Sequence, residues 1–257
     1  ALARKKWNEC LGKIEIKNGE KEKLTVFYTA LYHSMLLPFV ASDYNGEYLG
    51  ADGKIHQCET GDYYSGFSPW DTFRTLHPLL TLLQPTRQTD MIKSLLLMYE
   101  QSGKLYDGPM TGNHSIPVMV DSYKKGLINF DVDLAAEAMK SAIWNAPYKK
   151  TDFKSYIENG FVSAELPESV TRSLEYAYND WVLGEFLKDY QPARGEQLIE
   201  RSLNYRNLFN PETGLMSPKF ENGAWCDKGG YKEGDAWNYS WFVPHDISGL
   251  AELMGGK

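Results

Sequence analysis

Apolar side chains recur at helical spacing along most of this 257-residue chain. Over residues 21–37 the pattern is carried by Leu24, Phe27 and Leu31, and it stops before Pro38, which cannot continue a helix. The same period predicts helices over residues 71–83, 86–101, 113–125, 132–144, 168–188, 194–208 and 246–254. The hydrophobic pattern therefore predicts a mainly helical protein.

Loops of unequal length separate these helices. Residues 39–69 are rich in Gly, Asp and Tyr and predict a long excursion with a short β-hairpin at Asp52-Gly53. Asn-Pro-Glu-Thr-Gly at residues 210–214 predicts a turn, and Asp131 is placed to cap the helix that follows it. Alternating short and long loops are typical of stacked helical hairpins, in an α-solenoid or a closed α/α barrel. No repeat of about 34 or 40 residues is visible, which favours the barrel, and no linker-like stretch divides the chain.

The composition of the chain argues against some classes of function. The net charge of −7 argues against a nucleic-acid partner, because phosphate binding requires a basic face. No stretch approaches the roughly 18 uninterrupted apolar residues of a membrane span. The chain is rich in rings, with 7 Trp, 17 Tyr and 11 Phe, which serve cores and sugar-binding platforms alike. Three cysteines without CxxC spacing predict neither a zinc site nor a disulfide framework.

The segment Tyr-Lys-Glu-Gly-Asp-Ala-Trp-Asn-Tyr-Ser-Trp-Phe-Val-Pro-His-Asp, residues 231–246, holds the leading catalytic candidate, Glu233. Aromatic faces suit the apolar faces of sugar rings, and an acid held against apolar surface favours the protonated form that a general acid needs. The segment therefore predicts glycoside chemistry with Glu233 as general acid, and Asp235 and Trp237 as substrate-binding candidates. The alternatives are a surface glutamate near a helix start for Glu233 and a helix N-cap for Asp235. Asp246 is also placed as an N-cap.

Two further clusters carry polar side chains on constrained loops. Trp70-Asp71 stands at a loop-to-helix junction, where the ring can stack on a sugar and the carboxylate can bind hydroxyls. The alternative is that Asp71 caps the helix and Trp70 packs beneath it. Asn113-His114 follows a loop with two glycines and a proline, and such loops often present polar groups. Both are substrate-binding candidates, against the alternatives of a helix cap for Asn113 and a structural histidine for His114.

These clusters together resemble glycoside hydrolase family 92, the calcium-dependent exo-acting α-mannosidases. The matching segments follow the family's order along almost the whole chain: Phe27-Tyr28-Thr29-Ala30-Leu31-Tyr32-His33-Ser34, Trp70-Asp71-Thr72-Phe73-Arg74, Leu76-His77-Pro78-Leu79-Leu80-Thr81-Leu82, Gly112-Asn113-His114, Pro117-Val118-Met119-Val120-Asp121-Ser122-Tyr123, Ser173-Leu174-Glu175-Tyr176-Ala177-Tyr178, residues 207–214 and residues 233–246.

The resemblance implies an N-terminal β-sandwich followed by an (α/α)6 catalytic barrel. Residues 1–257 would then be a single, partial barrel domain with long loops and short β-hairpins, in which residues 1–40 form the junction and first helix. The sandwich and the C-terminal end of the barrel would be absent. The implied reaction removes terminal α-linked mannose from glycans with inversion, assisted by Ca²⁺. Glu233 falls on the family's general acid, and Asp71 with Trp70 falls on a contact to the mannose hydroxyls.

Two family motifs have no counterpart here: the Gly-Asn-Asp-Asp-like motif that supplies the base and a Gly-Asn-Glu-Pro-like loop near the calcium. We therefore expect the general base and most calcium ligands to lie outside this chain, and the isolated chain to be inactive or nearly so. Export to the periplasm, cell surface or medium is expected from the family alone. The competing hypotheses are a barrel hydrolase for another sugar, a non-catalytic carbohydrate-binding protein and a helical-repeat interaction module.

Overall fold

The computed structural model describes residues 2–59, 61–144 and 151–256. Its α-helices are α1 (Leu2–Leu11), α2 (Lys21–His33), α3 (Pro69–Thr72), α4 (Leu76–Leu83), α5 (Pro85–Ser102), α6 (Ser115–Lys124), α7 (Val132–Trp144), α8 (Thr151–Asn159), α9 (Ser169–Leu187), α10 (Pro192–Ser202), α11 (Ala236–Tyr239) and α12 (Ile247–Leu253). A 3₁₀-helix, η1 (Leu203–Leu208), continues α10. The predicted mainly helical class is confirmed.

Short antiparallel strand pairs interrupt the helices. The strands are β1 (Phe39–Val40), β2 (Glu47–Leu49), β3 (Ile55–Gln57), β4 (Tyr64–Ser65), β5 (Phe209–Asn210) and β6 (Leu215–Met216). In the part of the chain that the structure describes, β1 pairs with β4, β2 with β3, and β5 with β6. The β2–β3 hairpin confirms the prediction at Asp52-Gly53, and the β5–β6 hairpin encloses the predicted turn at residues 210–214.

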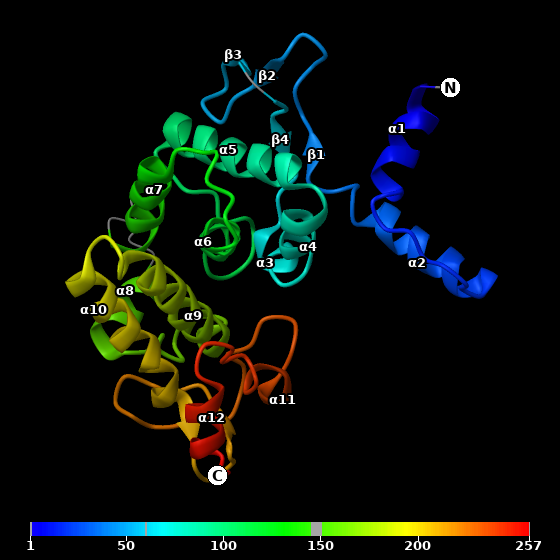
Figure 1. The fold of residues 1–257 in the computed structure, drawn as a ribbon. Helices are drawn as coiled ribbons and strands as arrows, with labels where there is room; N and C mark the ends of the chain where they lie inside the picture. The colour runs from blue at the N-terminus through cyan, green and yellow to red at the C-terminus, as the bar shows by residue number, and fades with distance from the viewer. Residues whose placement is uncertain (1, 60, 145–150, 257) are drawn as a thin grey trace.

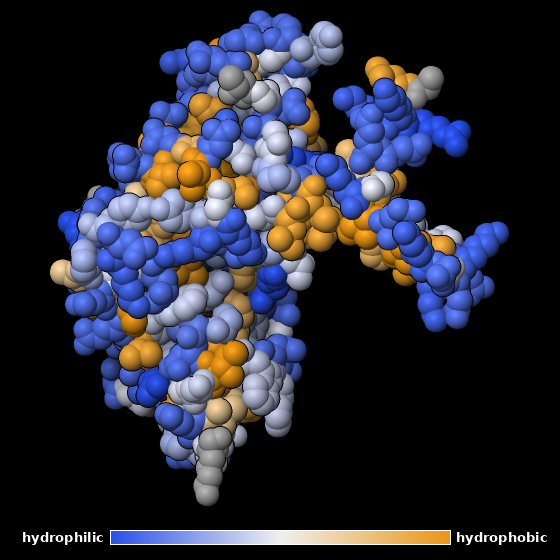
Figure 2. All heavy atoms as spheres, in the orientation of Figure 1, coloured by the Kyte–Doolittle hydropathy of each residue, from blue (hydrophilic) through white to orange (hydrophobic). Residues whose placement is uncertain are grey.

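Helices α1 and α2 form an arm that lies to one side of the other helices (Figure 1). The rings of Trp7 and Tyr32 join the two helices at a centroid distance of 4.7 Å. The predicted helix over residues 21–37 ends early, at His33. Residues preceding a proline avoid the α conformation, and Met35 and Leu36 instead donate to carbonyls three residues back, at 3.0 and 3.2 Å. In Figure 2 the outer parts of the arm are mostly hydrophilic, and apolar atoms gather where it meets the body.

The predicted helix over residues 71–83 is two helices, α3 and α4. Helix α3 begins with Pro69 at its first turn, where the missing N–H costs nothing. Thr75 has φ −138°, outside the helical region, and precedes α4. The break leaves Trp70 in α3 and Arg74 in the connection between the two helices. Helices α1, α8 and α11 were not predicted from the hydrophobic pattern.

Helix α9 is the centre of the molecule and is buried along most of its length. Its C-terminal half contributes Leu183 and Phe186 to a core shared with α4–α7, and its N-terminal half contributes Val170 and Leu174 to a second core shared with η1, β6, α11 and α12. Burying one such aliphatic side chain stabilises the fold by roughly 1.5–3 kcal/mol. Because one rigid helix belongs to both cores, segments distant in sequence are fixed relative to one another.

Helices α9 and α10 pack closely as an antiparallel hairpin (Figure 1). Gly184 and Gly195 allow this approach: a Cβ on Gly195 would stand 2.8 Å from the backbone nitrogen of Lys188. The Arg201 guanidinium then reaches Asp180 in α9, with both nitrogen–oxygen distances at 2.6 Å. No helix of the described residues is long and apolar enough to cross a membrane.

Candidate functional site

A hollow of about 350 Å³ contains the leading catalytic candidate. It is lined by Trp70 and Arg74 from the α3 region and by Glu233, Asn238, Tyr239, Trp241 and Phe242 from the later segment. A larger hollow of about 730 Å³ lies between β3 and α5, and its lining includes none of the predicted site residues. The smaller hollow is therefore the candidate site, because it joins the carboxylate to aromatic rings.

Glu233 stands on a tight turn immediately before α11. Its φ of 51° is left-handed, a conformation that non-glycine residues adopt only where the surroundings enforce it. Its side chain is exposed at the hollow. The two residues before Glu233 hold the turn: the Tyr231 hydroxyl donates to the Met216 carbonyl at 2.7 Å, and the Lys232 N–H donates to Thr171 Oγ1 at 3.0 Å.

Asp235 forms a capping box at the start of α11. Its carboxylate accepts from the Asn238 N–H and its own N–H donates to Asn238 Oδ1, both at 3.1 Å. The N-cap alternative for Asp235 is thus confirmed, whereas its contact with sugar stays a prediction. Asp246 caps α12 in the same way, accepting from the Gly249 N–H at 2.9 Å. The first of these caps lies two residues after Glu233 and fixes the start of α11 beside it.

Trp70 is oriented by a buried carboxylate that the sequence did not single out as a site residue. The indole N–H of Trp70 donates to Glu175 Oε1 at 2.8 Å, and Glu175 is completely buried in α9. The other oxygen of Glu175 faces Nε2 of His114, which is also fully buried. The His114 ring stacks on Phe73 at a centroid distance of 4.3 Å. His114 is not part of the described lining of the hollow, and its role as a substrate contact stays a prediction.

The sequence gives one indication of a role for Glu175, which is its position within a largely apolar stretch of the predicted helix. A glutamate within an otherwise core-facing stretch needs a partner, because an unpaired buried charge is costly. The partners, Trp70 and His114, are 105 and 61 positions away in the chain, so sequence spacing gives no hint of them.

Arg74 is the cation in the described lining of the hollow. Its guanidinium lies 4.9 Å from the Phe73 ring centroid and 4.8 Å from that of Phe242. Stacking between two rings stabilises a cation and fixes its direction. The residue was part of the Trp-Asp-Thr-Phe-Arg cluster but was not among the predicted site residues.

The remaining candidates lie around the hollow. Asp71 is exposed in the first turn of α3 and accepts from the Ser68 hydroxyl, so it does not cap the helix that follows. The Asn113 N–H donates to Asn179 Oδ1 at 2.7 Å, and its side-chain amide donates to the Leu105 carbonyl at 3.3 Å instead of capping α6. Trp237 is 68% exposed and lines a neighbouring hollow of about 430 Å³, which it shares with Trp241.

Several buried polar atoms near His114 have no partner among the described residues. They are Thr111 Oγ1, Asn113 Oδ1, His114 Nδ1 and Asn179 Nδ2. Leaving such atoms unpaired costs roughly 1–3 kcal/mol each unless water or a ligand satisfies them. None of the four residues belongs to the described lining of the hollow.

A calcium ion binds six to eight oxygen atoms, most of them from carboxylates, carbonyls and water. Nowhere in residues 2–59, 61–144 and 151–256 do three or more His, Cys, Asp or Glu side chains gather as a potential metal site. Glu233 is likewise the one carboxylate in the described lining of the hollow. We therefore derive no chemical step through a metal ion.

The chain is similar to known glycosidases over nearly all its length. An uncharacterized secreted glycosidase of Arthroderma benhamiae is 27% identical over 302 residues, covering 98% of this chain and 35% of the relative. The structure of a family GH92 inverting mannosidase from Bacteroides thetaiotaomicron has a TM-score of 0.92 and 35% identity, over 99% of this chain and 38% of that one. A GH92 α-mannosidase of the same organism, in complex with mannoimidazole, has a TM-score of 0.90 and 32% identity over 97% and 36%.

The chain spans little more than a third of the length of these relatives. Its structural similarity to the mannosidases confirms the predicted mainly α, α/α-barrel fold class. The sequence pattern of the glycosyl hydrolase family 92 catalytic domain matches residues 1–257 of this chain. The chain therefore belongs to glycosyl hydrolase family 92.

Proposed function

We propose that this chain is part of an inverting exo-α-mannosidase that removes terminal α-linked mannose from glycans. The observation that supports the proposal is a single hollow whose lining includes Glu233 together with the rings of Trp70, Trp241 and Phe242. Two structurally similar proteins of the same family are named as mannosidases, and one was solved with mannoimidazole, which supports mannose as the sugar.

Each side chain then has a distinct task. Glu233 donates a proton to the glycosidic oxygen while the bond to the mannose carbon breaks, and the leaving sugar departs as an alcohol. Trp70 stacks on the mannose ring, in an orientation that Glu175 fixes through the indole N–H. Asp71, Asn113, His114, Asp235 and Trp237 remain the proposed further contacts to substrate, directly or through the loop each one supports.

Inversion requires a second carboxylate about 6.5–9.5 Å from the acid, with an attacking water between them. We assign no base to the described residues, since Glu233 has no carboxylate partner in the lining of the hollow. The predicted calcium dependence and the position of its ligands also remain predictions. Arg74 offers a fixed positive charge beside the site, suited to a developing negative charge on the leaving group.

Binding and catalysis are best tested separately. Saturation-transfer NMR of the chain with methyl α-mannoside and methyl α-glucoside, each with Ca²⁺ and with a chelator, tests the sugar. We expect the mannoside to bind better, and Trp70→Ala to weaken that binding about tenfold, as the loss of one stacking ring implies. Equal binding of both sugars, or no effect of Trp70→Ala, would refute the mannose assignment.

The acid is tested with azide, which attacks as a nucleophile without a general base. Glu233→Gln should slow azide-assisted cleavage of methylumbelliferyl α-mannoside about 100-fold or more, because that leaving group needs a proton. Cleavage of dinitrophenyl α-mannoside, which leaves without protonation, should hardly change. Turnover without azide would show that a base lies within this chain. Binding without any turnover, unaffected by Glu233→Gln, would favour a non-catalytic carbohydrate-binding protein.

We also propose that the protein acts outside the cytoplasm. The support is the name of the Arthroderma relative, a secreted glycosidase, together with the extracellular occurrence of mannose-containing glycans as substrates. Cell fractionation of the source organism with an antibody to this chain tests the location, and recovery in the cytoplasmic fraction would contradict it.

A further inference from the structure

We propose that Glu168 is a positioning residue for the proposed acid: through Lys232 it holds the turn that presents Glu233 to substrate. The inference rests on the proposed function, because it assigns Glu168 a part in proton donation by Glu233. Glu168 lies just before α9.

Lys232 is held at three points, and it is the residue directly before Glu233. Its N–H donates to Thr171 Oγ1 at 3.0 Å, and its carbonyl accepts from the Tyr239 hydroxyl. Its ammonium group pairs with Glu168 Oε1 at 3.0 Å, with only 28% of the lysine side chain and 23% of the glutamate exposed. A backbone fixed on both sides of Lys232 leaves Glu233 in its left-handed conformation, with φ of 51°.

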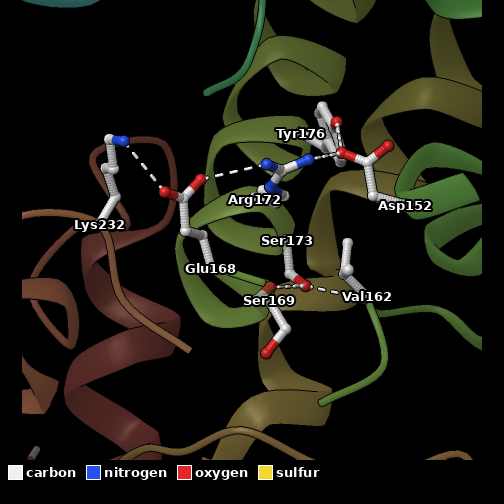
Figure 3. Close-up of polar contacts among 8 residues, drawn as sticks. All are labelled: Asp152, Val162, Glu168, Ser169, Arg172, Ser173, Tyr176 and Lys232. Carbon is white, nitrogen blue, oxygen red and sulfur yellow. Dashed lines mark hydrogen bonds and ion pairs between the residues drawn. The ribbon is translucent and has the colours of Figure 1, made fainter. Parts of the chain in front are cut away.

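Glu168 is itself tied to the interior of the molecule. Its second oxygen pairs with Arg172 Nη2 at 3.1 Å, and the other end of that guanidinium binds the carboxylate of Asp152 in α8. Asp152 also accepts from the Tyr176 hydroxyl at 2.8 Å. Figure 3 shows this row of side chains, with Glu168 between Lys232 and Arg172 and with Asp152 beyond. The turn at Glu233 is thus connected to the buried face of α9.

The charges of this network persist at neutral pH. Burial acts to raise the pKa of Glu168, but the hydrogen bonds and charges of Lys232 and Arg172 outweigh it and hold that pKa below its ordinary value. The pKa of Asp152 is likewise lowered, because Tyr176 and Arg172 outweigh the effect of burial. Each oxygen of Glu168 therefore serves one cation, Lys232 on the site side and Arg172 on the core side.

If Glu168 had a purely structural role, its ion pair with Arg172 would be sufficient. The pair with Arg172 lies within one turn of α9 and joins that helix to α8. The pair with Lys232 adds nothing to the contact between those helices. It crosses instead to the segment that carries Glu233, and so its removal should disturb that segment more than the stability of the whole chain.

Four variants of the 257-residue chain separate the two roles. Glu168→Gln removes both ion pairs at constant size, and Lys232→Met removes only the pair on the site side. Lys232→Arg keeps a cation within reach and should restore the arrangement. Glu165→Gln is the matched control, since Glu165 is exposed three residues earlier in the same loop.

The first readout is amide hydrogen exchange at Lys232, whose N–H donates to Thr171 in α9, and at Asp235 and Asn238, whose N–H groups donate to each other's side chains. We expect exchange about 10-fold faster in Glu168→Gln and Lys232→Met, the size of one charge-assisted hydrogen bond. Glu165→Gln and Lys232→Arg should exchange like the parent. Unchanged exchange in Lys232→Met, or an equal acceleration throughout α9, would overturn the proposal.

The second readout is the ratio of azide-assisted rates for methylumbelliferyl and dinitrophenyl α-mannosides. Misplacing the acid should lower this ratio about 10-fold in Glu168→Gln and in Lys232→Met, and Lys232→Arg should recover it. A loss of melting temperature without a change in the ratio would mean that Glu168 is only structural. If Glu233→Gln itself leaves the ratio unchanged, the proposed function fails, while the exchange measurement still decides whether Glu168 holds the turn.

Discussion

Glu175 offers the sharpest test of how the core supports the site. It is fully buried, and it accepts from Trp70 Nε1 at 2.8 Å while its other oxygen faces His114. Glu175→Ala removes the acceptor and leaves a polar indole N–H and a buried imidazole without their partner. Removing one member of a buried pair costs about 3–5 kcal/mol. For a chain of this size each 1 kcal/mol lowers the melting temperature by roughly 2–4 °C.

Glu175→Gln is the informative companion variant. Its amide oxygen can still accept from the Trp70 indole, but the charge that strengthens the hydrogen bond is lost. We expect a loss of about 1–2 kcal/mol, the difference between charged and neutral hydrogen bonds together with an imperfect fit at His114. Glu185→Gln is the control on the same helix, because Glu185 pairs with the nearby Lys188 near the surface. It should change the unfolding free energy by less than about 0.5 kcal/mol.

Urea unfolding followed by tryptophan fluorescence measures the three variants at pH 7. Methyl α-mannoside titrations of the folded variants then show whether Trp70 has moved. We expect affinity to fall about tenfold in Glu175→Ala and much less in Glu175→Gln, which keeps the acceptor. A destabilisation below about 1 kcal/mol in Glu175→Ala would refute the argument that this carboxylate is a buried, paired charge.

Three further predictions concern pH, backbone conformation and helix capping. Burial lowers the pKa of His77 from 6.5 to about 4, so the stability that the neutral imidazole contributes is complete above pH 6.5 and is lost as the pH falls toward 4. His77→Asn should remove about 3 kcal/mol of the fall in unfolding free energy between pH 7 and 4. Parallel curves of unfolding free energy against pH for the variant and the parent would contradict this. Gly112→Ala should cost about 2 kcal/mol by urea unfolding, because its φ is +75° and the new Cβ would stand 3.0 Å from Glu175 Cβ; no loss of stability would show that the loop adapts freely. Asp235→Ala should cost about 1 kcal/mol and speed exchange at the Asn238 amide, whereas Asp235→Asn should largely keep the cap; equal behaviour of the two variants would argue against capping.

Local chemistry in the sequence was enough to determine much of the fold. Apolar spacing located α5, α7, α9 and α12 within one or two residues, because each presents a continuous buried face. Asp131 was recognised as a cap, and its carboxylate accepts from the Leu134 N–H at 2.9 Å. Helices α1 and α8 were missed: α1 buries no residue, and two of the three buried residues of α8, Asp152 and Ser155, are polar. The apolar pattern of a helix reveals that helix only where one of its faces packs against an apolar core.

Ordered motifs in the sequence also determined the family, and they placed Glu233 and Trp70 among the candidates. Tertiary structure decided which candidates meet. Glu233 and Trp70 share one hollow, whereas Trp237 faces the neighbouring one. The partners of the supporting carboxylates Glu175 and Glu168 could not be recognised in the sequence, since they lie on other elements. Side-chain type and local spacing report a residue's own helix or turn, but burial and long-range pairing arise only when α9 brings both cores together.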